Sequence, residues 1–227
     1  MKFEKLSDCI TYYQQFHLTK HKYQWRANIL KYFDTVPLSE LRRFHIKKYA
    51  VMRSQVVSNA TINRELSFAK ASINCVNRDF ELNIVNPFSD MKYVEADFMP
   101  SYLSKDEYEK LIHSAKALNY HDLHDYIVLL AMTGCRPQEV RTLRWDCVYL
   151  DKRQFIVRNC WSKSKKTLYK YLNQTALEVL ERRLQNKQGD WVFTNKATNK
   201  PIDSYNKCFK KLRLHAGVDC TFYDLRH

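Results

Sequence analysis

The stretch TGCRPQEV, residues 133–140, decides how this chain is interpreted, because it predicts a sharp corner between two helices. An apolar run before it predicts a helix that ends at Gly134, since glycine commonly closes helices and lets the backbone turn. Pro137 suits the first position of the next helix, so Arg136 is expected beside unpaired backbone N–H groups. An arginine fork there can grip two oxygens of a phosphate, and Glu139 is close enough to brace it. The same two residues would also form an ordinary structural Arg–Glu pair.

On both sides of the corner the sequence predicts a mixed domain. Ser104 with Glu107 three residues later predicts a capping box at the start of a helix. After the corner, aromatic and β-branched residues predict three short strands, and amphipathic periodicity predicts helices beyond them. The strands are expected at Cys147–Leu150, Phe155–Arg158 and Thr167–Leu172, and the helices at Thr175–Lys187 and Tyr205–His215.

The first ~85 residues are predicted to be helical throughout. Within Leu38–Gln55, apolar residues recur at roughly helical spacing (Leu41, Phe44, Ile46, Tyr49 and Met52), and a second helix is expected after Ser58. Basic residues interleave with both. Such charges usually form a solvated face, but their repeated sign favours contact with nucleic acid through Arg42, Arg43, Arg64 and Lys70.

Residues 86–100, with Asn86-Pro87, two acidic residues and Pro100, predict a linker between domains. The fold class predicted is therefore mainly α with a small antiparallel β-sheet: a helical domain over 1–85, a linker over 86–100 and an α+β domain over 101–227.

Composition narrows the class of partner. The 227 residues hold 38 Lys+Arg and 24 Asp+Glu, a formal net charge of +14, which favours nucleic acid or an anionic membrane surface. No apolar run is long enough to span a bilayer and no signal segment follows the start, so the membrane alternative is the weaker. A basic protein with no polyanionic partner is the remaining alternative.

Cysteine and glycine exclude several chemistries. The seven cysteines are scattered and never spaced C-x-x-C, which argues against a disulfide framework and a zinc site and favours a reducing cytoplasm. Three glycines are too few for a P-loop or a dinucleotide fingerprint. We therefore expect neither metal nor nucleotide cofactor.

Two further elements carry candidate chemistry. The turn KSKK at residues 163–166 joins the second and third predicted strands; it is either a solvated hairpin tip or a finger that reaches a DNA groove, where a lysine can donate a proton to a leaving oxygen. The segment TFYDLRH, residues 221–227, is predicted to be helical, which would place Tyr223 and Arg226 on one face. Arg and His in a last helical turn would also suit the helix dipole.

In this order, T-G-x-R-x-x-E, a lysine on a β-hairpin and x-x-L-R-H resemble the tyrosine recombinase family, the phage-type integrases. The resemblance covers nearly the whole chain. Residues 1–85 resemble the helical, SAM-like core-binding domain, and 101–227 resemble the catalytic domain.

The resemblance implies roles for individual residues. Arg136 and Arg226 would bind the non-bridging oxygens of the scissile phosphate, and Glu139 would orient Arg136. Lys163 would be the general acid, with Lys165 or Lys166 as substitutes, and His227 would support the site. Family members join these groups to a tyrosine that forms a 3′-phosphotyrosyl link, which requires no nucleotide or metal.

Two departures from the family pattern matter. Tyr223 stands where most members have histidine; a phenol donates a hydrogen bond to phosphate but is a poor base at neutral pH. The family pattern also continues beyond His227 to the nucleophile, so the chain resembles a recombinase of mobile-element or phage type that is truncated before it. The expectation is DNA binding without strand cleavage.

Alternatives follow from the same residues. The chain could be a non-enzymatic DNA-binding remnant or a regulator that occupies recombination sites, or a relative of the type IB topoisomerases, which have a similar site. Double-stranded DNA is the expected partner, with a homo-oligomer on DNA and no membrane contact. We expect a cytoplasmic protein associated with the nucleoid when bound.

Overall fold

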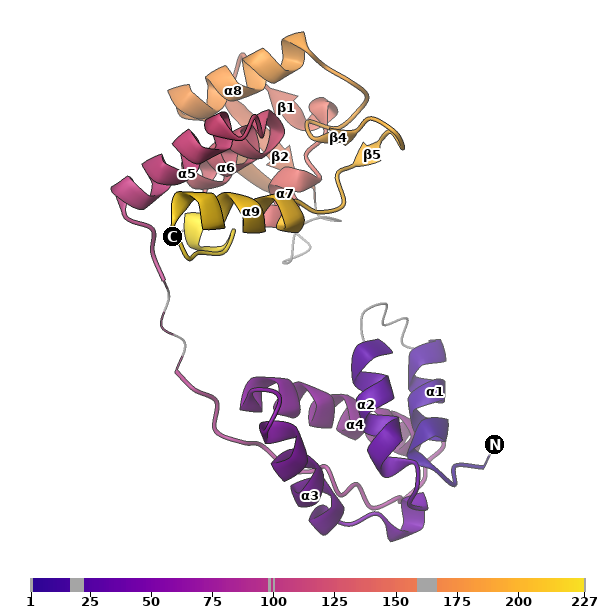
Figure 1. Ribbon diagram of the computed structural model, residues 1–227. Coiled ribbons are helices and arrows are strands. Elements are labelled where there is room, and N and C mark those ends of the chain that lie inside the picture. Colours follow the sequence, from indigo (N-terminus) through magenta and orange to yellow (C-terminus); the bar gives the residue numbers. More distant parts are fainter. Residues whose placement is uncertain (1, 17–22, 98, 100, 159–166, 227) are drawn as a thin grey trace. The chain divides into compact units, whose positions relative to one another are not determined.

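The computed structural model describes residues 2–16, 23–97, 99, 101–158 and 167–226 (Figure 1). The chain divides into two compact units, Met1–Phe98 and Met99–His227. The first is helical, and the second combines helices with a three-stranded and a two-stranded antiparallel sheet. This confirms the predicted fold class, mainly α with a small antiparallel sheet.

The first unit packs its helices around α4. Its elements are α1 (Leu6–Phe16), α2 (Tyr23–Phe33), the 3₁₀ turn η1 (Leu38–Glu40), α3 (Arg43–Ser54) and α4 (Asn59–Asp79). The sequence predicted helix from Leu38 to Gln55, but the backbone of Arg42 is extended (φ −129°, ψ 161°) and separates η1 from α3. Two fully buried aromatic rings, Phe33 and Tyr49, lie 4.9 Å apart in the core.

α3 has apolar residues on two opposite faces. Ile46 and Tyr49 are buried in the core, whereas Phe44 is 58% and Met52 is 45% exposed. Each helical residue turns about 100°, so Phe44 lies roughly 140–160° around the helix from Ile46 and Tyr49, whereas Met52 lies at the edge of the buried face. The apolar residues at helical spacing are therefore not all in the core, because Phe44 and Met52 are exposed.

The chain after α4 follows the surface of the first unit before it reaches the second. Phe88 is 1% exposed in the core of the first unit. The amide of Asn63 donates to the carbonyl of Tyr93 and accepts from its N–H, both at 2.8 Å. Part of the stretch expected as a linker is thus held by α4.

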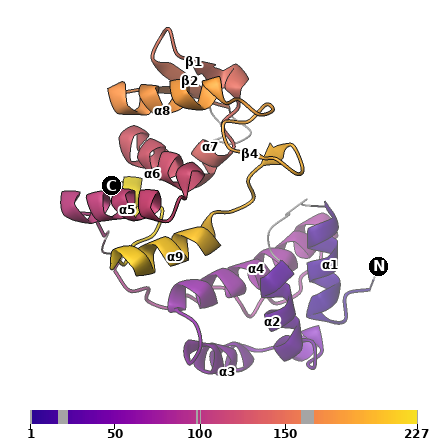
Figure 2. The same ribbon diagram turned by 45° about the horizontal axis from the view of Figure 1, so that its top comes forward.

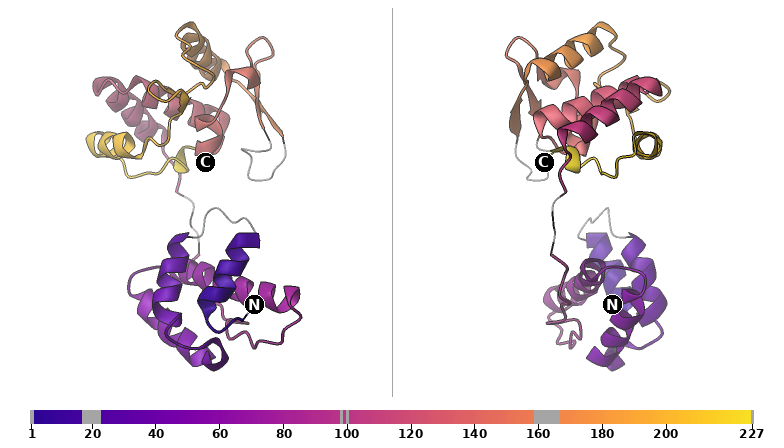
Figure 3. Two further views of the ribbon diagram at one scale, coloured as in Figure 1. Left: turned by 90° about the vertical axis from the view of Figure 1, so that its right-hand side faces the viewer. Right: turned by 60° about the vertical axis from the view of Figure 1, so that its left-hand side comes forward.

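The second unit places its three-stranded sheet along one edge, with the helices beside it (Figure 3). The strands pair antiparallel in the order β1-β2-β3, with Phe155 opposite Lys170. The predicted capping box is confirmed, because Ser104 accepts from the N–H of Glu107 at 3.2 Å and donates its own N–H to the Glu107 carboxylate at 2.8 Å. The elements are α5 (Lys105–Ala117), α6 (His121–Thr133), α7 (Pro137–Arg141), η2 (Trp145–Cys147), β1 (Val148–Tyr149), β2 (Gln154–Val157), β3 (Leu168–Tyr171), α8 (Gln174–Gln185), β4 (Thr194–Asn195), β5 (Lys200–Pro201), α9 (Asn206–Ala216) and η3 (Asp224–Arg226).

Aromatic packing fixes the end of the described chain against α6. The rings of Tyr126 and Phe222 lie 5.2 Å apart edge to face, and Phe222 stacks on Phe209 at 3.9 Å. Buried aromatic rings of this size contribute strongly to a core. Residues 221–226 are therefore held beside the helix that ends at Gly134.

Over its described part, residues 221–226, the segment does not form the predicted α-helix. It forms a turn followed by the short 3₁₀ element η3. The N–H and hydroxyl of Thr221 both donate to the Asp224 carboxylate, at 2.6 and 2.8 Å, as those of Ser104 donate to Glu107 at the start of α5.

Candidate functional site

The corner at residues 133–140 has the geometry that the sequence predicts. Gly134 ends α6 in the left-handed conformation (φ 59°), and its N–H donates to the carbonyl of Leu130 at 3.0 Å. Pro137 opens α7, with Arg136 as the extended residue before it. Arg136 therefore stands at the start of a helix, on a turn that only glycine makes without strain.

Glu139 holds Arg136 at two points. The Arg136 N–H donates to Oε2 of Glu139 at 2.8 Å, and Nη1 donates to Oε1 at 2.9 Å. The Glu139 side chain is 2% exposed, whereas that of Arg136 is 34% exposed. The other guanidinium nitrogens of Arg136 make no hydrogen bond within the described residues. The fork is thus oriented from behind and keeps donors free at its exposed edge.

Arg226 reaches this corner from the far end of the described chain. A Cβ built on Gly134 would lie 4.0 Å from the carbonyl oxygen of Arg226, so the two backbones are nearly in contact. Arg226 is half-buried, and no hydrogen bond or ion pair of its guanidinium is found among the residues that the structure describes. The backbone of Arg226 thus lies beside the corner that carries Arg136, and its charge acts on Cys135 within that corner.

Most other arginines of the second unit are already engaged. For example, Arg183 donates to the Asp122 carboxylate at 2.8 Å and to the carbonyl of Val192. The arginines of the corner thus differ from these, whose guanidinium groups are already bound to acceptors of the protein. The engaged arginines are Arg141, Arg144, Arg158, Arg182, Arg183 and Arg213.

Cys135 lies inside the corner as a neutral thiol. Its side chain is fully buried, and this burial raises its pKa, although the charges of Lys170 and Arg226 act in the opposite direction. A buried thiol with a raised pKa is a poor nucleophile. The chemistry of this site is thus that of cations around an anion.

Lys170 is a candidate that the sequence analysis missed. It is half-buried on β3 opposite the core residue Phe155, so it points to the same face of the sheet as its neighbours Leu168 and Leu172. Opposed residues in an antiparallel pair share a face. A lysine in an inward strand position was the available signal, and its charge acts on Cys135.

Tyr223 lies one residue before η3 and is 58% exposed. Its backbone N–H donates to the hydroxyl of Thr221 at 3.2 Å. Its carbonyl accepts from the N–H of Arg226 at 3.1 Å. In such a 3₁₀ turn, residues three apart lie on the same side, so Tyr223 and Arg226 share a face here without an α-helix.

The remaining predicted site residues divide into three groups. Arg42 and Arg43 bind their own unit, Arg42 through the carbonyl of Ser39 at 2.6 Å and Arg43 through Asp90 at 3.5 Å. Arg64 and Lys70 line a hollow of about 580 Å³ on α4. Lys163, Lys165, Lys166 and His227 lie outside the described residues.

Over the described part of the chain, no helix is long and apolar enough to cross a membrane. Within the same residues, no group of three or more His, Cys, Asp or Glu side chains could hold a metal ion.

A match to a known protein family covers most of the second unit. Residues 101–227 match the Phage integrase family. The integrase of Salmonella phage P22 is 24% identical over 203 residues, which are 84% of this chain and 51% of that protein. The integrase of Escherichia phage 186 is 30% identical over 115 residues, 49% of this chain and 34% of that protein. The chain thus spans about half the length of the first relative and a third of the second.

Solved structures share the fold at low identity. The integrase of the Tn1549 transposon, in complex with a circular intermediate DNA, superposes with a TM-score of 0.78 at 18% identity, covering 99% of this chain and 85% of that one. A lambda integrase dimer bound to a COC′ core site gives a TM-score of 0.79 at 17% identity, covering 98% of this chain and 87% of that one.

Proposed function

Because the chain belongs to the phage integrase family, we propose that it binds duplex DNA for site-specific recombination and holds the scissile phosphate between Arg136 and Arg226. The observation that supports this most directly is that the backbone of Arg226 lies beside Gly134, two residues from Arg136, and that both arginines keep guanidinium donors that the described residues do not use. Other members whose structures match were solved on DNA.

The chemistry proposed is electrostatic. Two arginines on the non-bridging oxygens would stabilise the charge that builds up as phosphorus is attacked. Glu139, fixed behind Arg136, keeps one fork in place before DNA arrives and so lowers the reorganisation needed. Lys163 is proposed as the general acid toward the leaving oxygen, with Lys165 and Lys166 as substitutes. Tyr223 would donate a hydrogen bond to the phosphate from the position of the family's histidine.

We propose a division of labour between the two parts of the chain. Residues 1–85 would form the core-binding domain, 86–100 the linker and 101–227 the catalytic domain. Arg64 and Lys70, in one hollow on α4, are the better DNA contacts, because Arg42 and Arg43 already bind carbonyls and a carboxylate of their own unit. Assembly of copies on DNA is proposed from the dimeric and tetrameric lambda integrase structures.

For the polypeptide of residues 1–227 taken alone, we propose DNA binding without cleavage. Of its 15 tyrosines, only Tyr223 stands in a family motif, and there it occupies the histidine position. A DNA-binding regulator that occupies recombination sites is the second candidate, favoured by this same substitution, since a phenol is a poor proton acceptor.

Two measurements test the proposal. Affinity for duplex DNA should fall steeply between low and physiological salt, because phosphate contacts release counterions; an isotherm unchanged by salt would contradict DNA binding. A nicked suicide DNA site should yield no covalent complex with residues 1–227. A covalent protein–DNA band that survives denaturation would overturn the non-cleaving proposal and leave the phosphate site standing.

A further inference from the structure

The outward face of α3 is an apolar surface that neither the core nor the proposed phosphate site uses. Three of its side chains are largely in solvent: Phe44 is 58%, Val51 is 67% and Met52 is 45% exposed. The opposite face of the same helix packs on the core through Ile46 and Tyr49. Figure 2 shows α3 at the periphery of the first unit. We call Tyr32, Phe44, Lys47, Lys48, Val51, Met52 and Gln55 the α3 outer surface.

This surface is hollowed and structured. Its residues line a depression of about 530 Å³. The ammonium group of Lys48 lies 4.5 Å above the Phe44 ring, a cation–π contact that orients both side chains. Contiguous exposed apolar patches on a protein surface commonly mark sites of interaction. The α3 outer surface is therefore a candidate binding site.

The spacing of the exposed residues fits a helix. Positions 44, 48, 51, 52 and 55 recur at three- and four-residue intervals over three helical turns, about 16 Å of axis. Such a row forms a ridge into whose grooves a second helix packs at 8–10 Å. A partner helix of similar length would bury the row along its whole extent.

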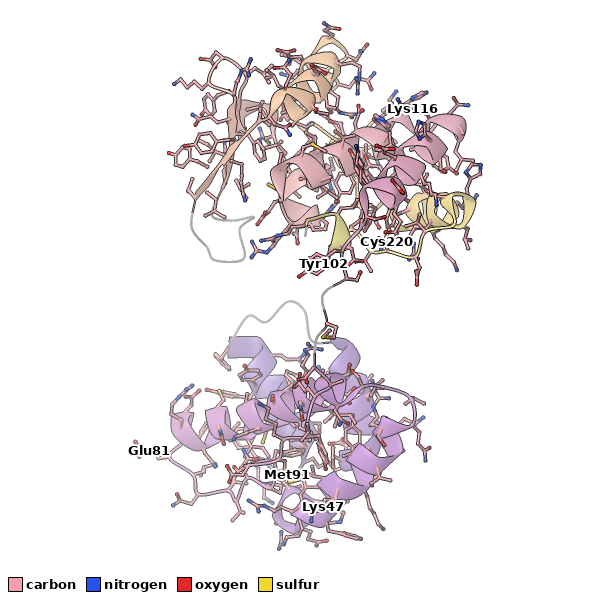
Figure 4. The ribbon with its side chains drawn as sticks, turned by 90° about the vertical axis from the view of Figure 1, so that its left-hand side faces the viewer. Lys47, Glu81, Met91, Tyr102, Lys116 and Cys220 are labelled. Atoms are coloured by element: carbon pink, nitrogen blue, oxygen red, sulfur yellow. The ribbon has the colours of Figure 1, made fainter. Side chains whose placement is uncertain are left out.

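The charge of the surface selects the kind of helix. Its lining contains two lysines, Lys47 and Lys48, one glutamine and no carboxylate. Figure 4 shows Lys47 at the surface of the first unit. A partner with apolar residues on one face and glutamate or aspartate along its edges would cover the apolar row and pair with both lysines.

We propose that the α3 outer surface binds an acidic amphipathic helix of a partner protein. A second copy of this chain fits less well. The described helix richest in acidic residues is α5, and its apolar residues Leu111 and Ala115 are fully buried in the second unit. The chain's net charge of +14 also opposes self-association.

DNA is likewise a poorer occupant. Base edges and phosphates call for polar and charged side chains, and the thymine methyl is the principal apolar group that the major groove presents. The basic residues Arg64, Lys70 and Lys92 line the separate hollow on α4, together with the carboxylates Asp90 and Glu95.

The test uses residues 1–227 and a labelled synthetic peptide of about 18 residues, long enough to be helical in solution. Leucines at positions i, i+3, i+4 and i+7 form its apolar face and glutamates its flanks; a second peptide has lysine in place of glutamate. Fluorescence anisotropy should show binding of the acidic peptide and at least about tenfold weaker binding of the basic one, since about 1.4 kcal/mol separates tenfold affinities.

Two variants locate the site. Val51→Ser with Met52→Ser should weaken acidic-peptide binding about tenfold or more, whereas Val85→Ser, which changes an equally exposed valine elsewhere in the first unit, should leave it unchanged. Lys47→Glu with Lys48→Glu should invert the preference toward the basic peptide. All five positions are exposed, and circular dichroism should confirm native folding.

Three results would overturn the proposal. One is acidic-peptide binding that the α3 variants do not change. Another is self-association of the wild-type chain in sedimentation velocity that Val51→Ser with Met52→Ser abolishes, which would assign the surface to a second copy. The third is an equal loss of duplex DNA affinity in that variant, which would assign the surface to DNA.

Discussion

Two buried carboxylates, Glu65 in the first unit and Glu139 in the second, each hold an arginine, and they differ in how much of that arginine they use. Glu65 accepts from Nε and Nη2 of Arg53, at 3.1 and 2.7 Å, and from the Tyr49 hydroxyl at 2.8 Å. Glu139 accepts from the backbone N–H and Nη1 of Arg136. The side chain of Arg53 is 14% exposed and that of Arg136 is 34% exposed.

The difference shows how one pair of residue types serves two purposes. A buried pair such as Arg53–Glu65, with two guanidinium nitrogens on one carboxylate, fixes the packing of α3 on α4 and leaves little of the arginine exposed to a ligand. A half-used pair orients the guanidinium and keeps its outer edge available. Breaking each pair should therefore affect stability in one case and DNA affinity in the other.

Removing the carboxylate of Glu65 should have the largest effect. Glu65→Ala leaves the charge of Arg53 and the hydroxyl of Tyr49 in the interior without their acceptor. Breaking a buried ion pair from one side costs about 3–5 kcal/mol. Urea unfolding followed by circular dichroism should show this loss in the transition of the first unit. Glu40→Gln, at an exposed position, is the control; a loss below about 1 kcal/mol for Glu65→Ala would contradict the structural role.

Arg136→Ala should show the opposite pattern. Each hydrogen bond to a charged group contributes about 1.5–3 kcal/mol, so duplex DNA affinity should fall on the order of 10–100-fold. Stability should fall by about 1–3 kcal/mol, less than in Glu65→Ala, because Oε1 of the buried Glu139 loses its partner while the backbone N–H at position 136 still donates to Oε2. Filter binding at fixed salt measures the first effect and urea unfolding the second. If stability fell as in Glu65→Ala with affinity unchanged, Arg136–Glu139 would be a structural pair only.

In the second unit, Asp125 is another buried carboxylate that is held by arginines, here Arg182 and Arg183. Burial acts to raise its pKa, but hydrogen bonds from His124 and Arg183 and the charge of Arg182 outweigh it, so the pKa lies below its usual value. A lowered pKa means stabilisation that is present above the unfolded value near 3.9 and is lost as the pH falls through the folded value.

Asp125→Asn should therefore destabilise the chain by about 1–3 kcal/mol at pH 7, the contribution of a hydrogen-bonded buried charge. The difference from wild type should shrink as the pH drops below about 4. Thermal unfolding at a series of pH values measures it. A difference that stays constant from pH 7 to pH 3 would show that lost packing, not the carboxylate charge, causes the effect.

The features that the sequence predicted depend on residues close together in the chain, whereas those it missed depend on contacts between residues far apart in the chain. The corner was predictable because Gly134, Pro137 and Glu139 lie within six residues of one another and act through local geometry. No local pattern brings Arg226 to Gly134; that approach depends on the packing of Phe222 on Tyr126, and only the family resemblance indicated it.

The errors have local physical causes as well. Thr221 and Asp224 bind each other as helix-opening residues do, and this local pattern could not show that the described residues after Thr221 form a 3₁₀ turn. The spacing in α3 is compatible with either side of the helix, so it could not show that Phe44 faces solvent. Lys170 was missed because a lysine in a strand is ordinarily expected on the solvent-facing side of the sheet. Here it lies on the side that faces the core.

A substitution at Gly134 has the smallest expected effect. It tests whether the backbone of the corner contributes to DNA affinity apart from the side chain of Arg136. Gly134 and Gly217 both end helices in the left-handed conformation, at φ 59° and 65°. Alanine in that conformation costs about 1 kcal/mol, so Gly134→Ala and Gly217→Ala should destabilise the chain equally in thermal unfolding.

A Cβ added at position 134 would make only an ordinary contact with Arg226, at 4.0 Å, and a Cβ added at position 217 would have no neighbour within 4 Å. Neither variant should therefore change DNA affinity more than about twofold, well below the effect of one lost bond to a charged group. A tenfold loss in Gly134→Ala alone, with the fold intact, would mean that the backbone of the corner, and not the free edge of Arg136, makes the decisive contact.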